Sequence, residues 1–259
     1  LKDLCMTAIQ IIDRIEYIHS KYIIHKDIKP DNILVGNPDS FVIYLIDFGI
    51  SRKYRSSFTG NHLKLLFNKK IQGTAEFISL NAMKGLEETR RDDLESIGYT
   101  LIDLYFGKLH WQHIKARTIE EKCMIIYQKK GSLKFENEFI NIPREIIELI
   151  KYAKKLKYDE KPNYNYLREL FKNCLKRMEA NNDLLFSWVK LNPSNLNKEN
   201  LNFVKICESS KLHTRKSSPH SRLLNNILHG NKSLSLNDNI LPQKNDTKLI
   251  EFSYSNNYN

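Results

Sequence analysis

The pattern of apolar and polar residues first predicts a helix at the start of the chain. Apolar residues recur at helical spacing from Leu4 to Ile18, which indicates an amphipathic helix over about residues 1–22. Two short apolar runs, at residues 33–35 and 41–46, then flank a Gly-Asn-Pro-Asp stretch. Because Gly, Asn and Pro favour turns, these two runs are typical of a β-hairpin.

Further helices are predicted after residue 90. The helix at residues 90–106 is apolar on most of its sides, which is typical of a buried central helix. Its apolar positions include Leu94, Ile97, Thr100, Leu101, Leu104 and Tyr105. Other helices are expected at residues 119–130, 143–156 and 163–178. The hairpin is the one pair of strands that we expect in about 180 residues, so the predicted fold class is mainly α.

The composition of the chain changes after about residue 180. Residues 181–259 are rich in Asn, Ser and Lys with isolated Leu, and they show no sustained periodicity. Such a segment offers little apolar surface to offset the entropy cost of ordering it. We therefore expect one folded domain over residues 1–180 and a disordered tail over residues 181–259. A short amphipathic piece at residues 183–190 is expected to dock on the body.

The composition describes a soluble globular chain, with 41% hydrophobic and 27% charged residues among 259. No apolar run is long enough to cross a bilayer, and the start lacks a signal-peptide pattern. The four cysteines show no metal-ligand spacing, which indicates reduced thiols and a cytoplasmic or nuclear location. The net charge of +11 suits acidic or phosphorylated protein partners. We expect a monomer that binds neither membranes nor nucleic acid.

The strongest chemical signal is the stretch His-Lys-Asp-Ile-Lys-Pro-Asp-Asn at residues 25–32, followed by Asp-Phe-Gly at residues 47–49. Asp27 and Asn32 lie five residues apart with a lysine between them, and Asp47 lies twenty residues after Asp27. This order of acid, cation, amide and second acid is the pattern of a phosphoryl-transfer site. A solvated turn explains the His-x-Asp part alone, but it does not explain the ordered combination with Asp-Phe-Gly.

Phosphoryl transfer explains these residue types, because positioning and neutralisation of charge supply most of its catalysis. Asp27 can accept or orient the proton of an attacking hydroxyl group. Asn32 and Asp47 flank the predicted hairpin, and they offer the hard oxygen ligands that Mg²⁺ prefers. Lys29 can place a compact positive charge near the transferred phosphoryl group.

Together with further stretches, this pattern resembles the casein kinase I family of serine/threonine protein kinases. The stretches are residues 12–21, residues 45–55, Ser-Leu-Asn at 79–81, Arg-Arg-Asp-Asp-Leu-Glu-Ser-Ile-Gly-Tyr at 90–99, and residues 161–168. The resemblance covers about residues 1–178. It implies the C-terminal lobe of a protein kinase with the small hairpin at its active site. Such an enzyme transfers the γ-phosphoryl group of ATP to serine or threonine hydroxyls of proteins with the help of Mg²⁺.

The resemblance also assigns roles to individual residues. The implied site consists of the catalytic base Asp27, the ATP-phosphate contact Lys29, the Mg²⁺ ligands Asn32 and Asp47, and Thr74, which would hold Asp27 and Lys29 in place. Asp93 would be a buried acid that accepts hydrogen bonds from the backbone of the catalytic loop. The alternative role for Asp93 is that of a plain helix N-cap.

Two residues depart from the family's pattern. Lys26 replaces the usual arginine before the catalytic Asp. Because activation-loop phosphorylation is not the usual switch in this family, we expect the change to be tolerated. Glu76 stands where the family commonly has an arginine that contributes to a pocket for phosphorylated or acidic substrates. The reversed charge puts that substrate preference in doubt.

The sequence contains no glycine-rich phosphate loop and no strand lysine paired with a helix glutamate, which are parts of an N-terminal kinase lobe. The chain also begins with Leu1 inside a predicted helix. We therefore expect a fragment whose N-terminal lobe lies upstream. One alternative is a small-molecule phosphotransferase of the aminoglycoside type, which shares part of the motif. The other is a catalytically silent scaffold made of one lobe, or an incomplete gene model.

Overall fold

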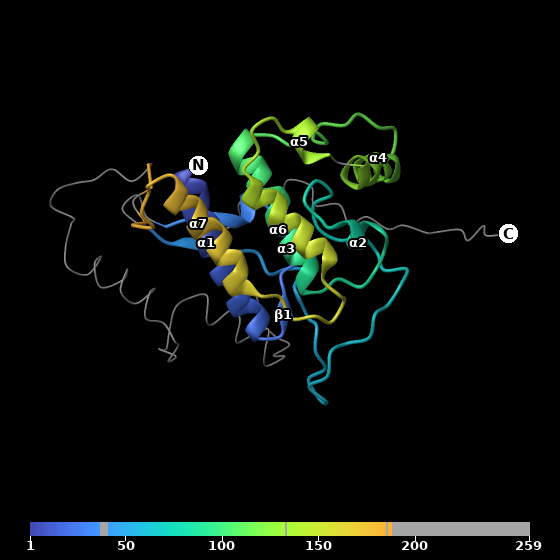
Figure 1. Ribbon diagram of the computed structural model, residues 1–259. Coiled ribbons are helices and arrows are strands. Elements are labelled where there is room, and N and C mark those ends of the chain that lie inside the picture. The colour runs from blue at the N-terminus through green and yellow to red at the C-terminus, as the bar shows by residue number, and fades with distance from the viewer. Residues whose placement is uncertain (37–40, 133, 185, 188–259) are drawn as a thin grey trace, which may run out of the picture. The chain divides into compact units, whose positions relative to one another are not determined.

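The computed structural model describes residues 1–36, 41–132, 134–184 and 186–187, and Figure 1 shows that helices dominate them. The helices are α1 (Lys2–Ser20), the 3-10 helix η1 (Pro30–Asn32), α2 (Leu80–Met83), α3 (Arg90–Phe106), α4 (Ile119–Ser132), α5 (Phe135–Glu138), α6 (Arg144–Lys155) and α7 (Tyr164–Arg177). The strands are β1 (Ile23–Ile24), β2 (Ile33–Val35), β3 (Ile43–Leu45) and β4 (Arg52–Lys53). The predicted long helices are confirmed, whereas the short helices α2 and α5 were not predicted.

Helices α1 and α7 pack against each other although they lie at opposite ends of the described chain (Figure 1). Helix α7 buries one apolar face, which includes Phe171, whereas residues 4–12 of α1 are buried on all sides. At the edge of this contact, Arg168 forms ion pairs with Asp13 at 3.0 Å and with Glu16 at 2.5 Å. The first helix therefore depends on the last one for much of its burial.

Helix α3 has clear signals at both ends and a close contact in its middle. It begins with a capping box, in which Thr89 and Asp92 satisfy each other's backbone N–H groups. It ends at Gly107, whose φ of 72° lies in the left-handed region that glycine adopts readily. A β-carbon at Gly98 would lie 2.1 Å from the Cγ1 atom of Ile150. Glycine at this position thus lets α3 and α6 approach closely.

The burial of α3 confirms the prediction for most of its length but not for its last turn. The side chains of Leu94, Ile97, Thr100 and Leu101 are 0% exposed. By contrast, Leu104 is 43% exposed and Tyr105 is 36% exposed, so the prediction of an apolar helix buried to its end is wrong there. Burial depends on which elements pack against a side chain, and periodicity alone does not report that.

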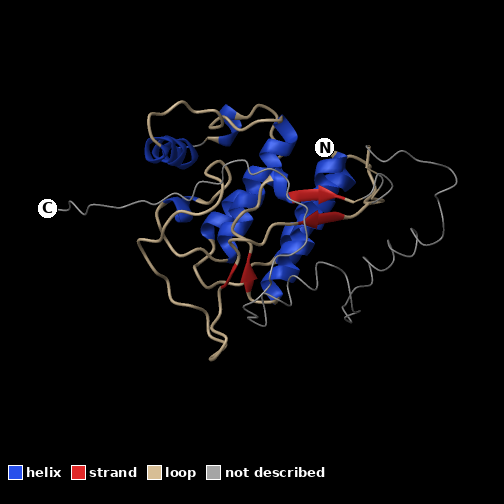
Figure 2. Ribbon diagram, turned by 180° about the vertical axis from the view of Figure 1, so that it is seen from behind, coloured by secondary structure: helices blue, strands red, loops and turns tan. Residues whose placement is uncertain are grey.

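The hairpin around the predicted turn is confirmed, with β2 and β3 antiparallel and Ile33 opposite Leu45. A second two-stranded sheet was not expected. In it β1 pairs with β4, and Ile23 lies opposite Lys53 (Figure 2). The prediction of one strand pair is therefore wrong. Strands of two residues are too short to produce an alternating pattern, so the sequence carries no periodic signal for them.

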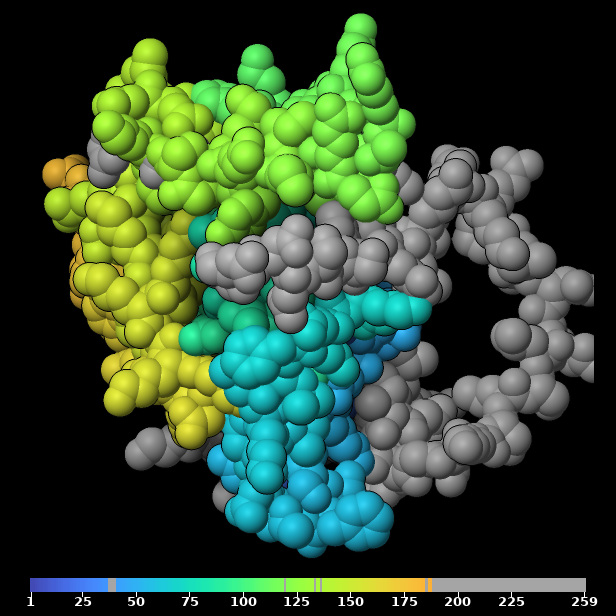
Figure 3. Space-filling model, turned by 90° about the vertical axis from the view of Figure 1, so that its right-hand side faces the viewer, coloured from blue at the N-terminus to red at the C-terminus, as the bar shows by residue number. Residues whose placement is uncertain are grey.

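Two further segments of the described chain lie outside the long helices: the loop between β4 and α2, and the stretch that follows α7. The loop between β4 and α2 forms the light blue and cyan surface in Figure 3, and Phe58 within it is 99% exposed. After α7, two residues contact the start of α1: Asp183 pairs with Lys2 at 2.9 Å, and Ser187 bonds to Asp3. Leu184 and Phe186 are buried, as the predicted docking of this piece requires.

The remaining residues of the predicted tail, 188–259, lie outside the described residues. No helix in the described part of the chain is both long and apolar enough to cross a membrane.

Candidate active site

The centre of the candidate site is the carboxylate of Asp27, which lies in the loop between β1 and η1. Its side chain is buried, and both of its oxygens are engaged. Oδ1 accepts hydrogen bonds from the backbone N–H of Thr74 at 3.1 Å and from its hydroxyl at 3.0 Å. Oδ2 accepts one from Asn32 Nδ2 at 3.1 Å and pairs with Lys29 Nζ at 3.1 Å. Four donors from three residues therefore fix the orientation of this acid.

Thr74 connects the acid with the cation beside it. Its hydroxyl donates to Asp27 and accepts a hydrogen bond from Lys29 Nζ at 2.9 Å. The lysine side chain is 14% exposed, so it is mostly but not completely buried. The expected contacts of Thr74 with Asp27 and Lys29 are thus confirmed, whereas the catalytic roles of the three residues stay predictions.

The two predicted Mg²⁺ ligands flank the hairpin, Asn32 before its first strand and Asp47 after its second. Asn32 immediately precedes β2, and its backbone C=O accepts a hydrogen bond from the N–H of Ile46, the residue before Asp47. The Nδ2 group of Asn32 also donates to Asp27 O at 2.8 Å, which leaves its Oδ1 atom to face a cation. Asp47 is exposed and has a φ of 62°, and its Oδ1 accepts from Gly49 N at 3.1 Å.

This donor set fits Mg²⁺, which is typically bound by one or two protein carboxylates together with phosphate oxygens and water. Nowhere in the described ranges do three or more His, Cys, Asp or Glu side chains gather in a way that could hold a metal ion. The pair of Asn32 and Asp47 is a different kind of site, because one of its two oxygens comes from an amide.

The catalytic loop is attached to helix α3 through Asp93. One carboxylate oxygen accepts from the N–H of His25 and the other from the N–H of Lys26, each at 2.8 Å. The prediction of a buried acid that bonds the loop backbone is confirmed. The N-cap alternative is wrong, since Thr89 and Asp92 form the cap of α3.

His25 ties the same loop to the strand that leads to Asp47. Burial lowers the pKa of His25, so its ring is neutral at neutral pH. In that state Nε2 donates to Ile46 O at 3.0 Å, and Nδ1 accepts from the N–H of Asp27 at 3.3 Å. The ring also packs against Phe48, with 4.9 Å between the ring centroids. The position of Asp27 is therefore linked to the Asp-Phe-Gly stretch.

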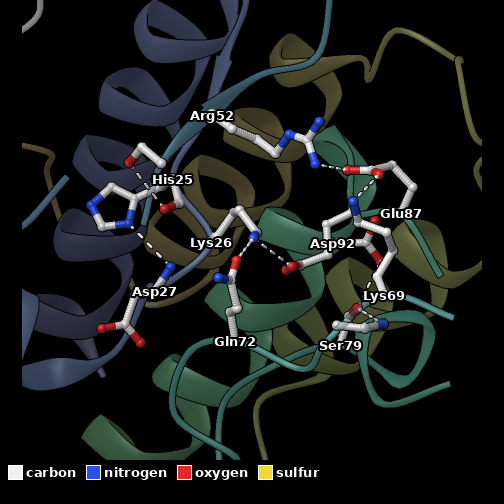
Figure 4. Close-up of polar contacts among 12 residues, drawn as sticks. His25, Lys26, Asp27, Arg52, Lys69, Gln72, Ser79, Glu87 and Asp92 are labelled. Carbon is white, nitrogen blue, oxygen red and sulfur yellow. Dashed lines mark hydrogen bonds and ion pairs between the residues drawn. The ribbon is translucent and has the colours of Figure 1, made fainter. Parts of the chain in front are cut away.

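Lys26 points away from Asp27 into a cluster of charged residues (Figure 4). Its ammonium donates to Gln72 at 2.6 Å and pairs with Glu88 at 3.2 Å. Burial raises the pKa of Glu88 to about 8, while the charge of Lys26 opposes the shift. Beside this pair, Arg52 and Lys69 converge on Glu87 at 2.5 and 3.4 Å. No local pattern pointed to Glu88 as a partner of Lys26, because Glu88 lies 62 positions after it in the sequence.

Glu76 belongs to the segment that follows Thr74, and it has a cation beside it. Its Oε1 atom lies 2.7 Å from Lys122 Nζ of α4. Its backbone C=O accepts a hydrogen bond from Trp111 Nε1 at 2.8 Å. The negative charge of Glu76, which departs from the family's pattern, is therefore compensated by the positive charge of Lys122.

A comparison with known families agrees with this geometry. The sequence model described as "Protein kinase domain" matches residues 2–233. The chain belongs to the protein kinase family. Protein kinases use ATP and Mg²⁺, and an Asp and an Asn of their catalytic loop and an Asp before Phe-Gly surround the phosphates. The match extends past residue 180, where we expected the domain to end, into residues that are not described.

Proposed function

We propose that this protein kinase is of the casein kinase I type and phosphorylates serine and threonine hydroxyls of protein substrates, using ATP and Mg²⁺. The observation that carries the proposal is the cluster in which Thr74 bonds to both Asp27 and Lys29 while Asn32 bonds to Asp27. This arrangement places a proton acceptor, a cation and a metal-ligand amide around one point. A cytoplasmic or nuclear monomer that acts on acidic or phosphorylated proteins is part of the same proposal.

Each residue has a distinct task in this mechanism. Asp27 accepts or orients the proton of the substrate hydroxyl, because its carboxylate is held fixed by donors from three residues. Lys29 contributes positive charge where negative charge develops on the transferred group. Asn32 and Asp47 would hold Mg²⁺, and the metal would neutralise the charge of the ATP phosphates. Thr74 holds the carboxylate of Asp27 and the ammonium of Lys29 in place relative to each other.

The test is to incubate the full-length protein with radiolabelled ATP, Mg²⁺ and a casein-like protein, and then to identify the labelled amino acids. Label on serine or threonine, absent with the Asp27→Asn variant, supports the proposal. Label on tyrosine contradicts the stated specificity. Label on an aminoglycoside and not on protein supports the small-molecule phosphotransferase. A lack of label with every acceptor supports the scaffold.

Asp47→Ala is expected to weaken Mg²⁺-nucleotide binding and to lower the rate, since a carboxylate ligand is lost. Activity should need a higher Mg²⁺ concentration for half-saturation than in the parent protein. The measurement is a Mg²⁺ titration of peptide phosphorylation at fixed ATP. Asp159→Ala, which removes an exposed acid, serves as the control. An unchanged Mg²⁺ dependence of Asp47→Ala would mean that Asp47 is not a ligand.

Glu76→Arg is expected to increase the preference for a phosphorylated peptide over its unphosphorylated form. In the parent protein Glu76 repels an anion and also neutralises Lys122. The substitution removes the carboxylate, releases that lysine and adds a guanidinium that can bind phosphate through two hydrogen bonds. The measurement is the ratio of kcat/KM for the two peptides. If the parent already prefers the phosphorylated peptide strongly, the account of Glu76 is wrong.

A further inference from the structure

A buried lysine lies beneath the segment that carries Thr74. Lys130 is in the last turns of α4 and its side chain is 0% exposed, whereas its neighbour Lys129 is exposed. Its ammonium donates hydrogen bonds to two backbone carbonyls, Ala75 O at 3.1 Å and Ile78 O at 2.7 Å. A lysine is rarely buried completely unless its charge has partners. Here the partners are main-chain atoms of the site segment.

Two aromatic rings complete the surroundings of this ammonium. The Nζ atom lies 4.3 Å from the ring centroid of Tyr99 and 5.7 Å from that of Trp111, distances typical of cation–π contacts. Trp111 also donates to Glu76 O. Side chains outside the segment therefore bind three of the four carbonyls of residues 75–78. They hold this stretch of backbone against α4 and the loop between α3 and α4.

The opposite side of the same segment is held against the catalytic loop. Thr74 bonds to the carboxylate of Asp27 through its N–H and its hydroxyl. The residue before it, Gly73, has a φ of 91°, and a β-carbon there would lie 2.9 Å from Lys26 O. The segment of residues 73–78 is thus bound to Asp27 through Thr74 and to Lys130 through Ala75 and Ile78.

We propose that Lys130 is a positioning residue, whose positive charge holds the carbonyls of Ala75 and Ile78 so that Thr74 stays in contact with Asp27 and Lys29. The inference rests on the proposed function, since it matters only if Asp27 and Lys29 take part in phosphoryl transfer. The proposed effect is on the part of the site that orients the hydroxyl of the protein substrate. Lys130 itself touches neither the reacting groups nor the predicted Mg²⁺ ligands.

The charge of Lys130 is sensitive to pH in the neutral range. Burial lowers its pKa to about 7. The charged and titratable groups that face it are Glu95 and Tyr99 of α3, Glu76 of the segment, Lys154 of α6 and Cys123 of α4. The two glutamates favour the ammonium, and Lys154 disfavours it. Above pH 7 the neutral amine holds the two carbonyls less strongly, because charge-assisted hydrogen bonds are the stronger kind.

The experiment compares Lys130→Met with Lys129→Met, which changes the same side chain at an exposed position of the same helix. For Lys130→Met we expect kcat for a peptide substrate to fall by roughly 10²-fold, the loss that a misplacement of about 1 Å can cause. The KM for ATP should change less than kcat, because the predicted Mg²⁺ ligands Asn32 and Asp47 do not contact the displaced segment. Lys129→Met should match the parent protein. Parental kcat for Lys130→Met overturns the inference.

A pH profile separates positioning by charge from a merely structural role. In the parent protein, kcat/KM for the peptide should fall as the pH rises through about 7. Lys130→Arg, which stays charged at every pH used, should lack this fall. Glu88→Gln should keep it, which excludes the titration of this buried acid as the cause. A fall that persists in Lys130→Arg overturns the inference, even if Lys130→Met does not fold.

Failure of the inference and failure of the proposed function give different results. If Asp27→Asn is as active as the parent protein, the proposed function itself is wrong. If Asp27→Asn is inactive but Lys130→Met and Lys130→Arg behave like the parent at every pH, only the role of Lys130 is wrong.

Discussion

Asp27→Asn is expected to lower kcat for peptide phosphorylation by about 10²–10⁴, the range that general acid–base groups contribute. The amide cannot accept the proton of the substrate hydroxyl. In the parent protein, the carboxylate of Asp27 accepts hydrogen bonds from Thr74 and Asn32 and pairs with Lys29. The amide of the variant would therefore place an NH₂ group against one or more of these donors. The measurement is the initial rate at saturating ATP and peptide, with the KM values of both substrates determined separately.

The matched control for this prediction is Asp31→Asn. Asp31 lies four residues further along the same loop and is exposed, so it undergoes the same chemical change away from the donors that surround Asp27. Its rate should stay close to that of the parent protein. Circular dichroism must show that both variants are folded. A folded Asp27→Asn variant with parental kcat would contradict the assignment of Asp27 as the base.

The sequence predicted the long helices well because apolar residues recur along each of them over many turns. The apolar residues of α1, α6 and α7 show this pattern, and turn residues marked the hairpin between β2 and β3. The pairing of β1 with β4 could not be predicted in this way. Each of these strands has only two residues, and 28 positions separate the end of β1 from the start of β4. The register of the pair depends on tertiary contacts that no local pattern encodes.

The same distinction applies to the candidate site. Asp27, Lys29 and Asn32 lie within six residues, so their spacing alone placed them together. Thr74 and Asp93 were found through the resemblance, since nothing in their spacing links them to the loop. Lys130 and Glu88 were missed. A charged residue in a polar stretch usually faces solvent, and only the packing around these two shows that they are buried partners of the site.

One buried network connects the last helix with the catalytic loop. Burial lowers the pKa of His19, and the neutral ring accepts from the Tyr164 hydroxyl at 2.7 Å through Nδ1 and donates to Asp93 at 2.8 Å through Nε2. Asp93 in turn accepts from the backbone of His25 and Lys26. Although burial alone would raise it, the pKa of Asp93 is lowered, chiefly by the hydrogen bond from His19. The acid is therefore ionised and bound by three donors.

Asp93→Asn is expected to lower the free energy of unfolding by about 1–3 kcal/mol, the cost of leaving a buried hydrogen-bond donor without its acceptor. The amide must direct its NH₂ group toward at least one of these donors, which leaves that donor unsatisfied. The catalytic loop would also lose an attachment, so kcat should fall together with stability. Urea unfolding at neutral pH measures the change, with the exposed Asp159→Asn as the matched control.

The pH dependence of stability gives a second test of Asp93. An acid with a lowered pKa stabilises the fold fully above its unfolded-state pKa of about 4. That contribution is lost as the pH falls through the lower folded-state value, because the native carboxylate must then be protonated. Unfolding free energies should therefore decrease less steeply below pH 4 in Asp93→Asn than in the parent protein or in Asp159→Asn. If the unfolding free energy decreased equally steeply with pH in all three proteins, the ionised carboxylate of Asp93 would not be what holds the catalytic loop to α3.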